Sequence, residues 1–378
     1  MSQLYASEAP GSILLAEYPS SNSDQTRFRN VDRYIIHDPF PPPRPELLKC
    51  LGPHHLMFGW GDQLAVTSQS APPSILVDHW CRLLGDAAKP GWVEFDRQSL
   101  EQDYIVLFPH QSLSPDKQLV PPNINYHLHS KEVIQEIACP QAQVLASPEY
   151  PCIAKLSHGY AGLGNYWLNN ESDYLAMNDE LSQHWPGATV IFNSIIQDVC
   201  GDNGIQFFLK RDGSIHWLGF TEQNFDRSGR WCGGTFSATK QDQQLQKFRP
   251  IIEPTAAYLS SKGYLGVVGI DILEDKNGNV FLVDVNPRLT GITPFLIASR
   301  IFATRPGHAE GRYQASCRFP GNLVQLIEHA EACSNGIIAV LSAFDDESAG
   351  ETICHLSVTA DSQQNCTSIL DQFLQPQT

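Results

Sequence analysis

The stretch GIDILEDKNGNVFLVDVNPR (residues 269–288) carries the strongest structural signal in the chain. Apolar residues alternate on both sides of Asn277-Gly278, and such a dipeptide between two apolar strands predicts a β-hairpin. A two-residue turn at this point sets Asp271 directly opposite Asp284 on one face of the sheet. Directly opposed side chains lie only about 5 Å apart, so two carboxylates in this relation repel each other.

A bound cation would remove that repulsion. Strand side chains alternate between faces, so Asn286 and Arg288 share the face of Asp284. Two carboxylates and an amide oxygen suit Mg²⁺, which binds one or two carboxylates and completes its shell with water and phosphate oxygens. Arg288 is then placed to contact a phosphoryl oxygen. The alternative is a pair of edge-strand aspartates in water, with Asn286-Pro287 ending the strand.

The composition limits the classes of function. The chain has 378 residues, 42% of them hydrophobic, which is enough for two or three packed units. A net charge of −16 is a poor match for nucleic acid. We find no apolar run long enough to span a membrane and no secretory signal. The ten cysteines show no CxxC pair and no metal-ligand spacing, which predicts reduced thiols in a cytoplasmic protein.

Short apolar runs alternate with turn-rich segments over residues 12–125, which predicts a small α/β unit. These runs include SILLAEY, RYIIHD, SILVDHWCRLL and YIVLFPHQ. The proline cluster at 38–48 predicts a surface connection that leads into a helix. Farther along, the patterns predict a helix in HSKEVIQEIACP, a helix in ESDYLAMNDELSQHW, a strand in ATVIFNSIIQDV and a hairpin turning at Asp212-Gly213. Residues 241–263 predict helix on either side of Pro254, and two strands and a helix follow after residue 335.

A glycine-rich stretch, KLSHGYAGLGN (residues 155–165), follows a predicted strand that carries Lys155. Glycine allows backbone amides to approach a phosphate closely, and the lysine would add a positive charge. A glycine-rich hairpin loop without a ligand is also common. The stretch is neither a Walker loop nor a Rossmann fingerprint. Lys131, near the start of a predicted helix, reads by itself as an ordinary exposed lysine.

Together, these segments resemble the ATP-grasp superfamily in their order and spacing, over roughly residues 120–300. The specific feature is the pair Asp271 and Asp284, thirteen residues apart and followed by Asn286 and Pro287-Arg288. The resemblance implies an α/β (α+β) protein in which two α+β subdomains clasp ATP. It implies four parts: a pre-ATP-grasp α/β domain (1–125), a small subdomain with the glycine-rich loop (126–189), a large subdomain with the metal site (190–330) and a C-terminal β-α segment (331–378). Residues 205–234 are also similar, more loosely, to the pheganomycin-type peptide ligases.

The resemblance also implies roles for individual residues. Lys131 and Lys155 would contact the α- and β-phosphates, and Arg288 would steady the transferred γ-phosphate. One or two Mg²⁺ ions, with Mn²⁺ as an alternative, would bind Asp271, Asp284 and Asn286. The remaining contacts to ATP would come from the closing loop (Ser157, Gly159, Gly162, Gly164), from the adenine hinge (Asn193, Ser194, Ile195, Ile196) and from Asp198 at the ribose.

The chain departs from the family pattern at three places. The family usually has glutamate at the position of Asp284, more often a glutamate pair at Asn193-Ser194, and a Gly-x-Glu ribose motif that is missing near Asp198. These departures affect the metal geometry, the nucleotide preference and the ribose contact.

The expected reaction is an ATP-dependent ligation of a carboxylate to an amine through an acyl phosphate, releasing ADP and phosphate. The substrates would be small molecules such as amino acids or short peptides. Arg300 and Arg312 are candidates to bind a substrate carboxylate, although each also reads as a structural arginine. Three alternatives stay open: ligation to a thiol such as a carrier protein, a regulatory protein that only binds ATP, and a transferase or dehydrogenase on the N-terminal unit. A homodimer is the default expectation for an enzyme of this size.

Overall fold

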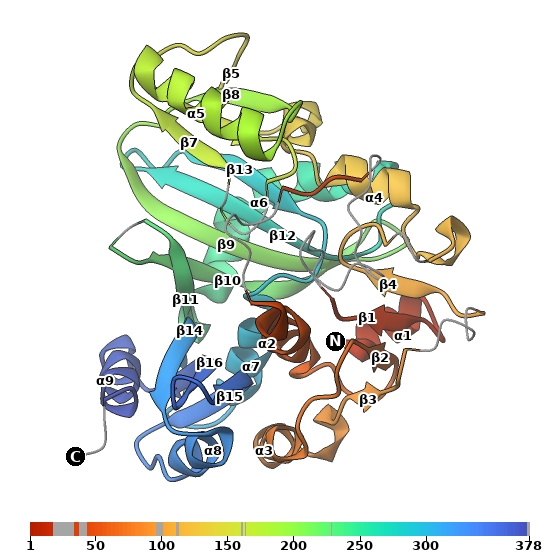
Figure 1. Cartoon of the computed structure of the whole chain (residues 1–378), viewed down its shortest axis with the longest axis vertical. Helices are drawn as coiled ribbons and strands as arrows, with labels where there is room; N and C mark the ends of the chain where they lie inside the picture. Colours follow the sequence, from red (N-terminus) through yellow and green to blue (C-terminus); the bar gives the residue numbers. More distant parts are fainter. Residues whose placement is uncertain are drawn as a thin grey trace.

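The computed structural model describes residues 1–17, 34–37, 44–95, 101–110, 113–159, 162, 164–227 and 229–375. It contains three sheets, arranged as a large central sheet with a small sheet above one end and a second small sheet beside it (Figure 1). The part of the chain described here holds no helix that is both long and apolar enough to cross a membrane.

The N-terminal unit is a parallel four-stranded sheet in the order β3-β2-β1-β4, with helices around it. Parallel strands need crossover connections, and α2 and α3 lie in those from β1 to β2 and from β2 to β3. Its strands are β1 (Ile13–Leu15), β2 (Ala65–Thr67), β3 (Gly91–Trp92) and β4 (Tyr104–Val106), and its helices are α1 (Ser2–Glu8), α2 (Pro45–Met57), α3 (Ser74–Leu84) and η1 (Asp86–Ala88). The predicted α/β unit is thus present, and α2 is the helix expected after the proline cluster. Residues 38–43 of that cluster lie outside the described residues.

A short connection of three helical turns leads from this unit to the small subdomain. These turns are η2 (Pro115–Lys117), α4 (Pro122–Leu128) and η3 (Lys131–Glu136). The helix expected in HSKEVIQEIACP is therefore a 3₁₀-helix. Ser130 caps its first turn by accepting a hydrogen bond from the N–H of Glu132.

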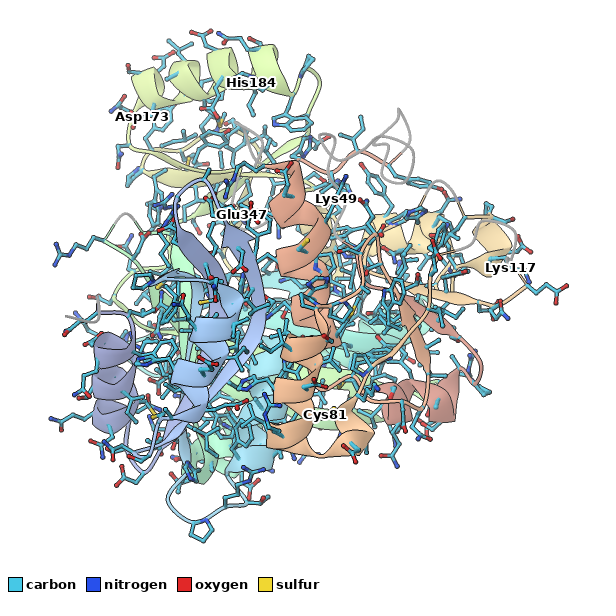
Figure 2. All side chains as sticks on the ribbon, turned by 60° about the horizontal axis from the view of Figure 1, so that its bottom comes forward. Lys49, Cys81, Lys117, Asp173, His184 and Glu347 are labelled. Carbon is cyan, nitrogen blue, oxygen red and sulfur yellow. The ribbon has the colours of Figure 1, made fainter. Side chains whose placement is uncertain are left out.

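The small subdomain is an antiparallel sheet in the order β5-β8-β6-β7, covered on one face by α5. Its elements are β5 (Val144–Leu145), β6 (Cys152–Leu156), β7 (Asn165–Leu168), α5 (Glu171–His184) and β8 (Val190–Ser194). Along β6 burial alternates, so Cys152, Ala154 and Leu156 pack under α5 while Ile153 and Lys155 lie on the other face. Helix α5, which carries Asp173 and His184, is the outer layer of this subdomain (Figure 2).

The central sheet has eight strands in the order β13-β12-β9-β10-β11-β14-β16-β15. Its strands are β9 (Val199–Leu209), β10 (Ile215–Phe225), β11 (Trp231–Ser237), β12 (Gly266–Asp275), β13 (Val280–Asn286), β14 (Glu310–Pro320), β15 (Ile337–Asp346) and β16 (Glu351–Ala360). The helical elements that accompany it are η4 (Ala238–Lys240), α6 (Gln241–Ser261), α7 (Thr293–Phe302), α8 (Leu323–Glu331) and α9 (Gln363–Phe373). The segments expected as 190–330 and 331–378 therefore share one sheet.

Helix α6 covers one face of this sheet without a break at Pro250 or Pro254. Its buried residues recur at helical spacing (Phe248, Ile251, Ile252, Thr255, Ala256, Leu259), and they pack on the apolar residues of β9, β12 and β13. The opposite face of β12 and β13 carries the polar side chains of the predicted metal site.

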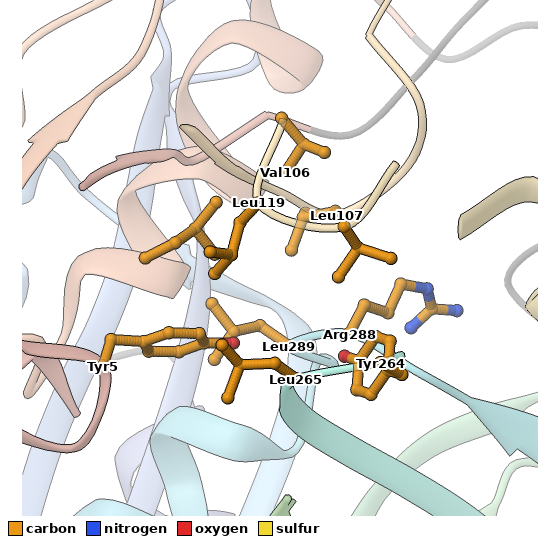
Figure 3. Close-up of a pocket in the computed structure, with 10 residues that line it drawn as sticks. Tyr5, Val106, Leu107, Leu119, Tyr264, Leu265, Arg288 and Leu289 are labelled. Carbon is orange, nitrogen blue, oxygen red and sulfur yellow. The ribbon is translucent and has the colours of Figure 1, made fainter. Parts of the chain in front are cut away.

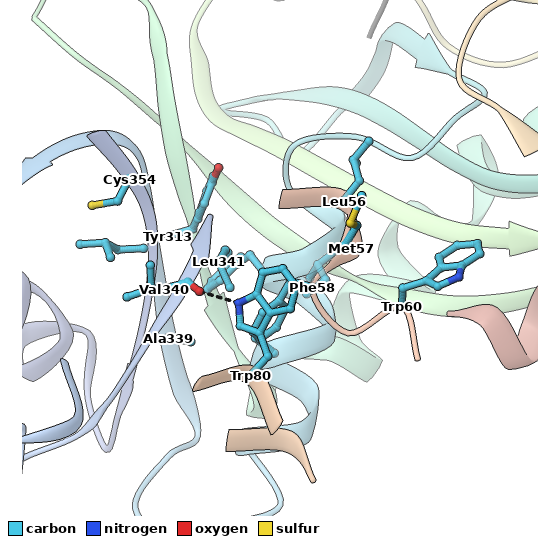
Figure 4. Close-up of a cluster of buried hydrophobic side chains, with 14 of the residues drawn as sticks. Leu56, Met57, Phe58, Trp60, Trp80, Tyr313, Ala339, Val340, Leu341 and Cys354 are labelled. Atoms are coloured by element: carbon cyan, nitrogen blue, oxygen red, sulfur yellow. Dashed lines mark hydrogen bonds between the residues drawn. The ribbon is translucent and has the colours of Figure 1, made fainter. Parts of the chain in front are cut away.

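The N-terminal unit also packs on the last part of the chain. Helices α2 and α3, which carry Lys49 and Cys81, lie against the C-terminal strands (Figures 1 and 2). Figure 4 shows Phe58 and Trp80 among Ala339, Val340 and Leu341 of β15. The indole Nε1 of Trp80 donates to the Val340 carbonyl at 2.8 Å. The Val340 N–H donates to His79 Nε2 at 3.1 Å, so α3 satisfies the outer edge of β15.

One predicted element is placed differently. The run RYIIHD does not join the N-terminal sheet: of its residues the structure describes 34–37, and His37 forms a parallel bridge with Gly159 of the glycine-rich loop.

Candidate active site

Asp271 lies directly opposite Asp284, as the sequence predicts, but by a different route. The turn has three residues, since the N–H of Asp275 donates to Asn279, and Gly278 takes a positive φ of 80°. This shifts the pairing by one residue next to the turn. A β-bulge between Asp271 and Ile272, in which Val283 is the extra residue, shifts it back. The two irregularities cancel at the aspartates.

The polar groups of β12 and β13 form a connected network. Gln223 Nε2 donates to Asp271 Oδ1 at 2.9 Å, and Asn286 Nδ2 lies 3.4 Å from Asp271 Oδ2. Arg288 Nη2 donates to Asn286 Oδ1 at 2.8 Å. The guanidinium of Arg288 also lies 5.0 Å from the centre of the Phe108 ring, which comes from the N-terminal side of the chain. In Figure 3 it points away from the apolar cluster around Leu265 and Leu289.

Two lysines reach this network from other elements. Lys131, the first residue of η3, forms an ion pair with Asp284 and donates to both of its carboxylate oxygens. Lys155 of β6 donates to the Val283 carbonyl at 3.0 Å. The structure therefore brings together six residues predicted from sequence: Lys131, Lys155, Asp271, Asp284, Asn286 and Arg288.

The pKa values of the two aspartates are shifted in opposite directions. Burial and the neighbouring charges of Asp284 and Asp202 raise the pKa of Asp271 to about 7. Burial also opposes ionisation of Asp284, but Lys131, Lys155 and Arg288 outweigh it, so the pKa of Asp284 lies below its ordinary value. Burial lowers the pKa of Lys155. The Lys131 ammonium and the raised pKa of Asp271 both reduce the repulsion between the two carboxylates.

The donor set fits a divalent cation of the hard type. The described residues contain no cluster of three or more His, Cys, Asp or Glu side chains suited to a metal, so the ligands here would be two carboxylates. The Asn286 amide oxygen would join them only after it leaves Arg288. Mg²⁺ accepts such a sparse set because phosphates and water supply the remaining ligands. The Lys131 ammonium already marks the site as one that attracts a cation.

A narrow cavity lies between the small subdomain and β13. It is lined by Lys131, Ile134, Gln135, Ala142, Val144, Lys155, Asn193, Leu282 and Val283. Its volume of about 20 Å³ is enough for a water molecule and too small for a purine base. Asn193, which was predicted to belong to the adenine hinge, lines it, and the two lysines lie at the same cavity. A nucleotide would have to part the small subdomain from the hairpin in order to enter.

The hinge and the loop use several of their polar groups internally. Ser194 exchanges hydrogen bonds with Gln143, since its N–H donates to the Gln143 carbonyl and its hydroxyl accepts from the Gln143 N–H. Ile195 and Ile196 form the connection from β8 to β9. Ser157 is buried, its N–H donates to Thr189, and its hydroxyl contacts Ser130 at 2.8 Å. A phosphate contact from Ser157 would therefore require rearrangement.

Two glycines of the loop have backbone conformations or contacts that disfavour any other residue. Gly162 and Gly164 have positive φ values of 76° and 80°. A Cβ on Gly164 would lie within 2.7–2.9 Å of the Leu156 side chain, so only glycine fits there. The N–H of Gly159 donates to the Leu156 carbonyl. Phosphate binding by Gly159, Gly162 and Gly164 stays a prediction.

Three further predicted site residues lie apart from the network, the loop and the hinge. Asp198 is exposed and pairs with Lys276 at 3.0 Å, which ties the hinge to the hairpin turn. Arg300 donates to the carbonyls of Trp217 and Leu218 at 2.6 and 3.1 Å. Arg312 points toward α9, where its Nη1 lies 3.4 Å from Thr367 Oγ1. Arg300 and Arg312 bind the protein itself, so we do not carry them forward as substrate contacts.

Two polar residues of the site were missed. Asp202 of β9 pairs with Leu273, which places it on the Asp271 face, and burial raises its pKa to about 6. Gln223 of β10 holds Asp271. Polar residues at alternate positions of β9 and β10 indicate a polar sheet face. The order of the strands must also be known before Asp202 and Gln223 can be placed beside Asp271.

Comparisons with known proteins agree with this architecture. Residues 131–286 match the family described as L-aspartate--L-methionine ligase, ATP grasp. A stretch of 155 residues, 41% of this chain, is 23% identical to the [butirosin acyl-carrier protein]--L-glutamate ligase of Niallia circulans and spans 36% of that protein. The chain thus covers about a third of the length of this relative.

Solved structures give the fold. N5-carboxyaminoimidazole synthetase from Staphylococcus aureus, complexed with ADP, is similar with a TM-score of 0.55 and 12% identity over 83% of this chain and 91% of that one. The biotin carboxylase domain of the Hydrogenobacter thermophilus 2-oxoglutarate carboxylase, in complex with MgADP, gives a TM-score of 0.51 and 11% identity over 82% and 73%. The predicted fold is therefore confirmed, while the looser likeness to pheganomycin-type ligases stays a prediction. The chain has the ATP-grasp fold, and its residues 131–286 are related to the ATP-grasp ligases.

Proposed function

We propose that the protein is an ATP-dependent carboxylate–amine ligase that forms an amide or peptide bond and releases ADP and phosphate. The observation that carries the proposal is the convergence of Lys131, Lys155 and Arg288 on the aspartate pair Asp271 and Asp284. Three cations from separate elements at one carboxylate pair suit a triphosphate with its metal. The relation of residues 131–286 to ATP-grasp ligases supports the same reaction class.

The residues would divide the work as follows. Lys131 and Lys155 would neutralise charge on the α- and β-phosphates, and Arg288 would hold the γ-phosphate as it moves to the substrate carboxylate. Asp271, Asp284 and Asn286 would hold Mg²⁺, which when bound offsets phosphate charge. The carboxylate accepts the γ-phosphoryl group to give an acyl phosphate and ADP, and the amine then displaces phosphate. The glycine-rich loop would exclude water from the acyl phosphate.

A second acceptor class deserves a direct test, because the related Niallia circulans enzyme is named for an acyl-carrier protein. The alternative is a ligase that joins the acyl group to a carrier-protein thiol. A regulatory protein that binds ATP without turnover is the remaining reading. Its difficulty is that such a protein has no need of Arg288, which would hold the transferred γ-phosphate.

One experiment separates these possibilities. The protein is incubated with ATP, Mg²⁺ and pools of carboxylic acids with amino acids, short peptides or pantetheine, while ADP, phosphate and products are followed by mass spectrometry. Ligation to an amine with ADP release is the expected result. AMP and pyrophosphate would overturn the acyl-phosphate route, product formed only with pantetheine would favour the thiol reading, and ATP binding without turnover would favour the regulatory one.

We also propose a cytoplasmic location and a homodimer. The need for ATP and the ten free cysteines support the location. Sedimentation analysis measures the oligomeric state, and a monomer at micromolar concentration would contradict the dimer.

A further inference from the structure

A short N-terminal segment, residues 34–37, lies against the glycine-rich loop instead of the N-terminal sheet. The N–H of His37 donates to the His158 carbonyl at 3.0 Å, and His37 pairs with Gly159 in a parallel bridge. In Figure 1 the segment is a short red-brown piece beside α4. A segment from the N-terminal part of the chain therefore touches the loop that follows Lys155.

Side chains fasten this bridging segment to the surrounding elements. Tyr126 of α4 donates its hydroxyl to the Ile35 carbonyl at 2.9 Å. Tyr34 donates to Asn123 Oδ1 at 2.6 Å. The His37 ring meets the Trp185 ring edge-on, with centroids 5.1 Å apart. The segment thus joins α4, the glycine-rich loop and the residue that ends α5.

His158 connects the bridging segment to the loop. Its ring stacks on Tyr126, with centroids 3.9 Å apart and planes 7° from parallel. His158 Nε2 lies 3.0 Å from the Tyr126 carbonyl, which can only accept, so Nε2 carries the hydrogen. Nδ1 then accepts from the Ser157 hydroxyl at 3.1 Å. Burial lowers the pKa of His158 to about 4, so the neutral ring keeps this arrangement at neutral pH.

The same chain of contacts ends at Lys131. The Ser157 hydroxyl also lies 2.8 Å from the Ser130 hydroxyl. Ser130 in turn caps η3, and the Lys131 N–H donates to the Ser157 carbonyl at 2.8 Å. The ammonium of Lys131 reaches Asp284. An unbroken set of hydrogen bonds thus runs from residues 34–37 to a lysine of the candidate nucleotide site.

We infer that residues 34–37 and His158 position the nucleotide site: they hold the start of the glycine-rich loop and the backbone of Lys131 in place, so this segment tunes the affinity for the nucleotide. The inference rests on the proposed function for the identity of the ligand. The mechanical coupling does not depend on it, because the contacts exist without a ligand. None of these residues needs to touch the reacting atoms.

Tyr126→Phe tests the inference, because it keeps the ring that stacks on His158 and removes the bond to Ile35. Tyr166→Phe is the matched control, since its hydroxyl binds Glu180 at 3.0 Å in the same subdomain and does not contact the bridging segment. Hydrogen exchange is measured by mass spectrometry on the full chain without ligand, in peptides that contain residues 34–37 and 155–159. We expect about fivefold faster exchange in both peptides of Tyr126→Phe, the change expected for the loss of one hydrogen bond.

A second measurement titrates ADP with Mg²⁺ into both variants. We expect weaker ADP binding in Tyr126→Phe, with an increase in KM for ATP and an unchanged kcat, and no change in Tyr166→Phe. The inference would be overturned if Tyr126→Phe exchanged faster in residues 34–37 but at the wild-type rate in residues 155–159. It would also be overturned if the wild type bound ADP and Tyr126→Phe bound it with the same affinity. If the wild type binds no ADP, the proposed function fails. The exchange data then still show whether residues 34–37 are coupled to the glycine-rich loop. Tyr34→Phe repeats the test at the other anchor.

Discussion

Lys155 donates to the carbonyl of Val283, the extra residue in the bulge that brings Asp284 opposite Asp271. A bulge leaves its extra residue out of the regular ladder, so this carbonyl is available to a side chain from another sheet. Strand β6, which supplies Lys155, is thereby hydrogen-bonded to the bulge of β13 that aligns the two carboxylates. A change at either position should affect the other.

Replacing Lys155 by Met should remove turnover and leave the fold intact. The variant loses a positive charge at the phosphates and one hydrogen bond to Val283, while the unbranched side chain keeps much of the packing. We expect kcat to fall by about 100-fold or more. ADP release is the measurement. Lys117→Met is the control, because it changes a half-buried lysine outside the site whose ammonium also donates to a backbone carbonyl, that of Glu101. Wild-type turnover in Lys155→Met would show that the nucleotide lies elsewhere.

Asp284 should be required for the metal-dependent part of nucleotide binding. In Asp284→Asn the ion would lose a charged ligand and Lys131 would lose its partner, so Mg²⁺ should no longer strengthen ADP binding. Calorimetric titration of ADP with and without Mg²⁺ measures this, with Asp179→Asn on the exposed side of α5 as control. Asp284→Glu restores the family's usual residue and should keep turnover within about tenfold. A full Mg²⁺ effect in Asp284→Asn would exclude this carboxylate as a ligand.

Acid should destabilise the protein through its buried histidines. His55 donates from Nε2 to the Gly291 carbonyl at 2.6 Å, and burial lowers its pKa to about 4. The unfolded chain binds the proton near pH 6.5, so the stabilisation is complete above that pH and is lost as the pH falls toward 4. In His55→Gln, whose amide keeps the bond to Gly291, the free energy of unfolding should fall by about 2 kcal/mol less than in the wild type between pH 7 and pH 5.

Urea unfolding at the two pH values measures this difference. Asp202 and Asp271, whose raised pKa values act in the opposite direction, are present in both proteins, so their effect cancels. Equal acid sensitivity in the two proteins would show that His55 is already protonated or solvated in the folded state.

Trp80 should contribute to stability through one hydrogen bond as well as through packing. Trp80→Phe keeps an aromatic ring between Phe58 and β15 but leaves the buried Val340 carbonyl without its donor. We expect a loss of about 1–3 kcal/mol for that carbonyl, plus a cost for the smaller ring. Urea unfolding gives the value, and Trp167→Phe, at an exposed position, should change it by less than about 0.5 kcal/mol. A loss no larger than that of the control would show that water reaches Val340.

The hairpin was predictable because its information is local. Alternation and the Asn277-Gly278 signal gave the strands, and the opposition of Asp271 and Asp284 was correct although the turn has three residues. A bulge has no reliable sequence signal, so the compensation at Val283 could not be foreseen. The lysines became meaningful only through their order along the chain, because each by itself looks like a surface residue.

Long-range pairing was not predictable. Asp202 and Gln223 join the site because β9 lies beside β12 and β10 lies next to β9. No local pattern specifies that order. The run around Tyr34 and His37 had the apolar character of a strand, and tertiary contacts with Tyr126 and His158 directed it elsewhere. Arg300 and Arg312 were predicted as substrate contacts, but each has a partner within the protein. Arg300 donates to a carbonyl of β10 and Arg312 lies at a hydroxyl of α9, and neither partner is near in sequence.

The bond between Trp80 and Val340 spans 260 residues, and this separation constrains the order of folding. At the rate of translation, α3 leaves the ribosome roughly 10 to 50 s before Val340 is made. For that time the apolar sides of α2 and α3 have no strand to cover them. The N-terminal unit is therefore synthesised well before the strand that completes its packing.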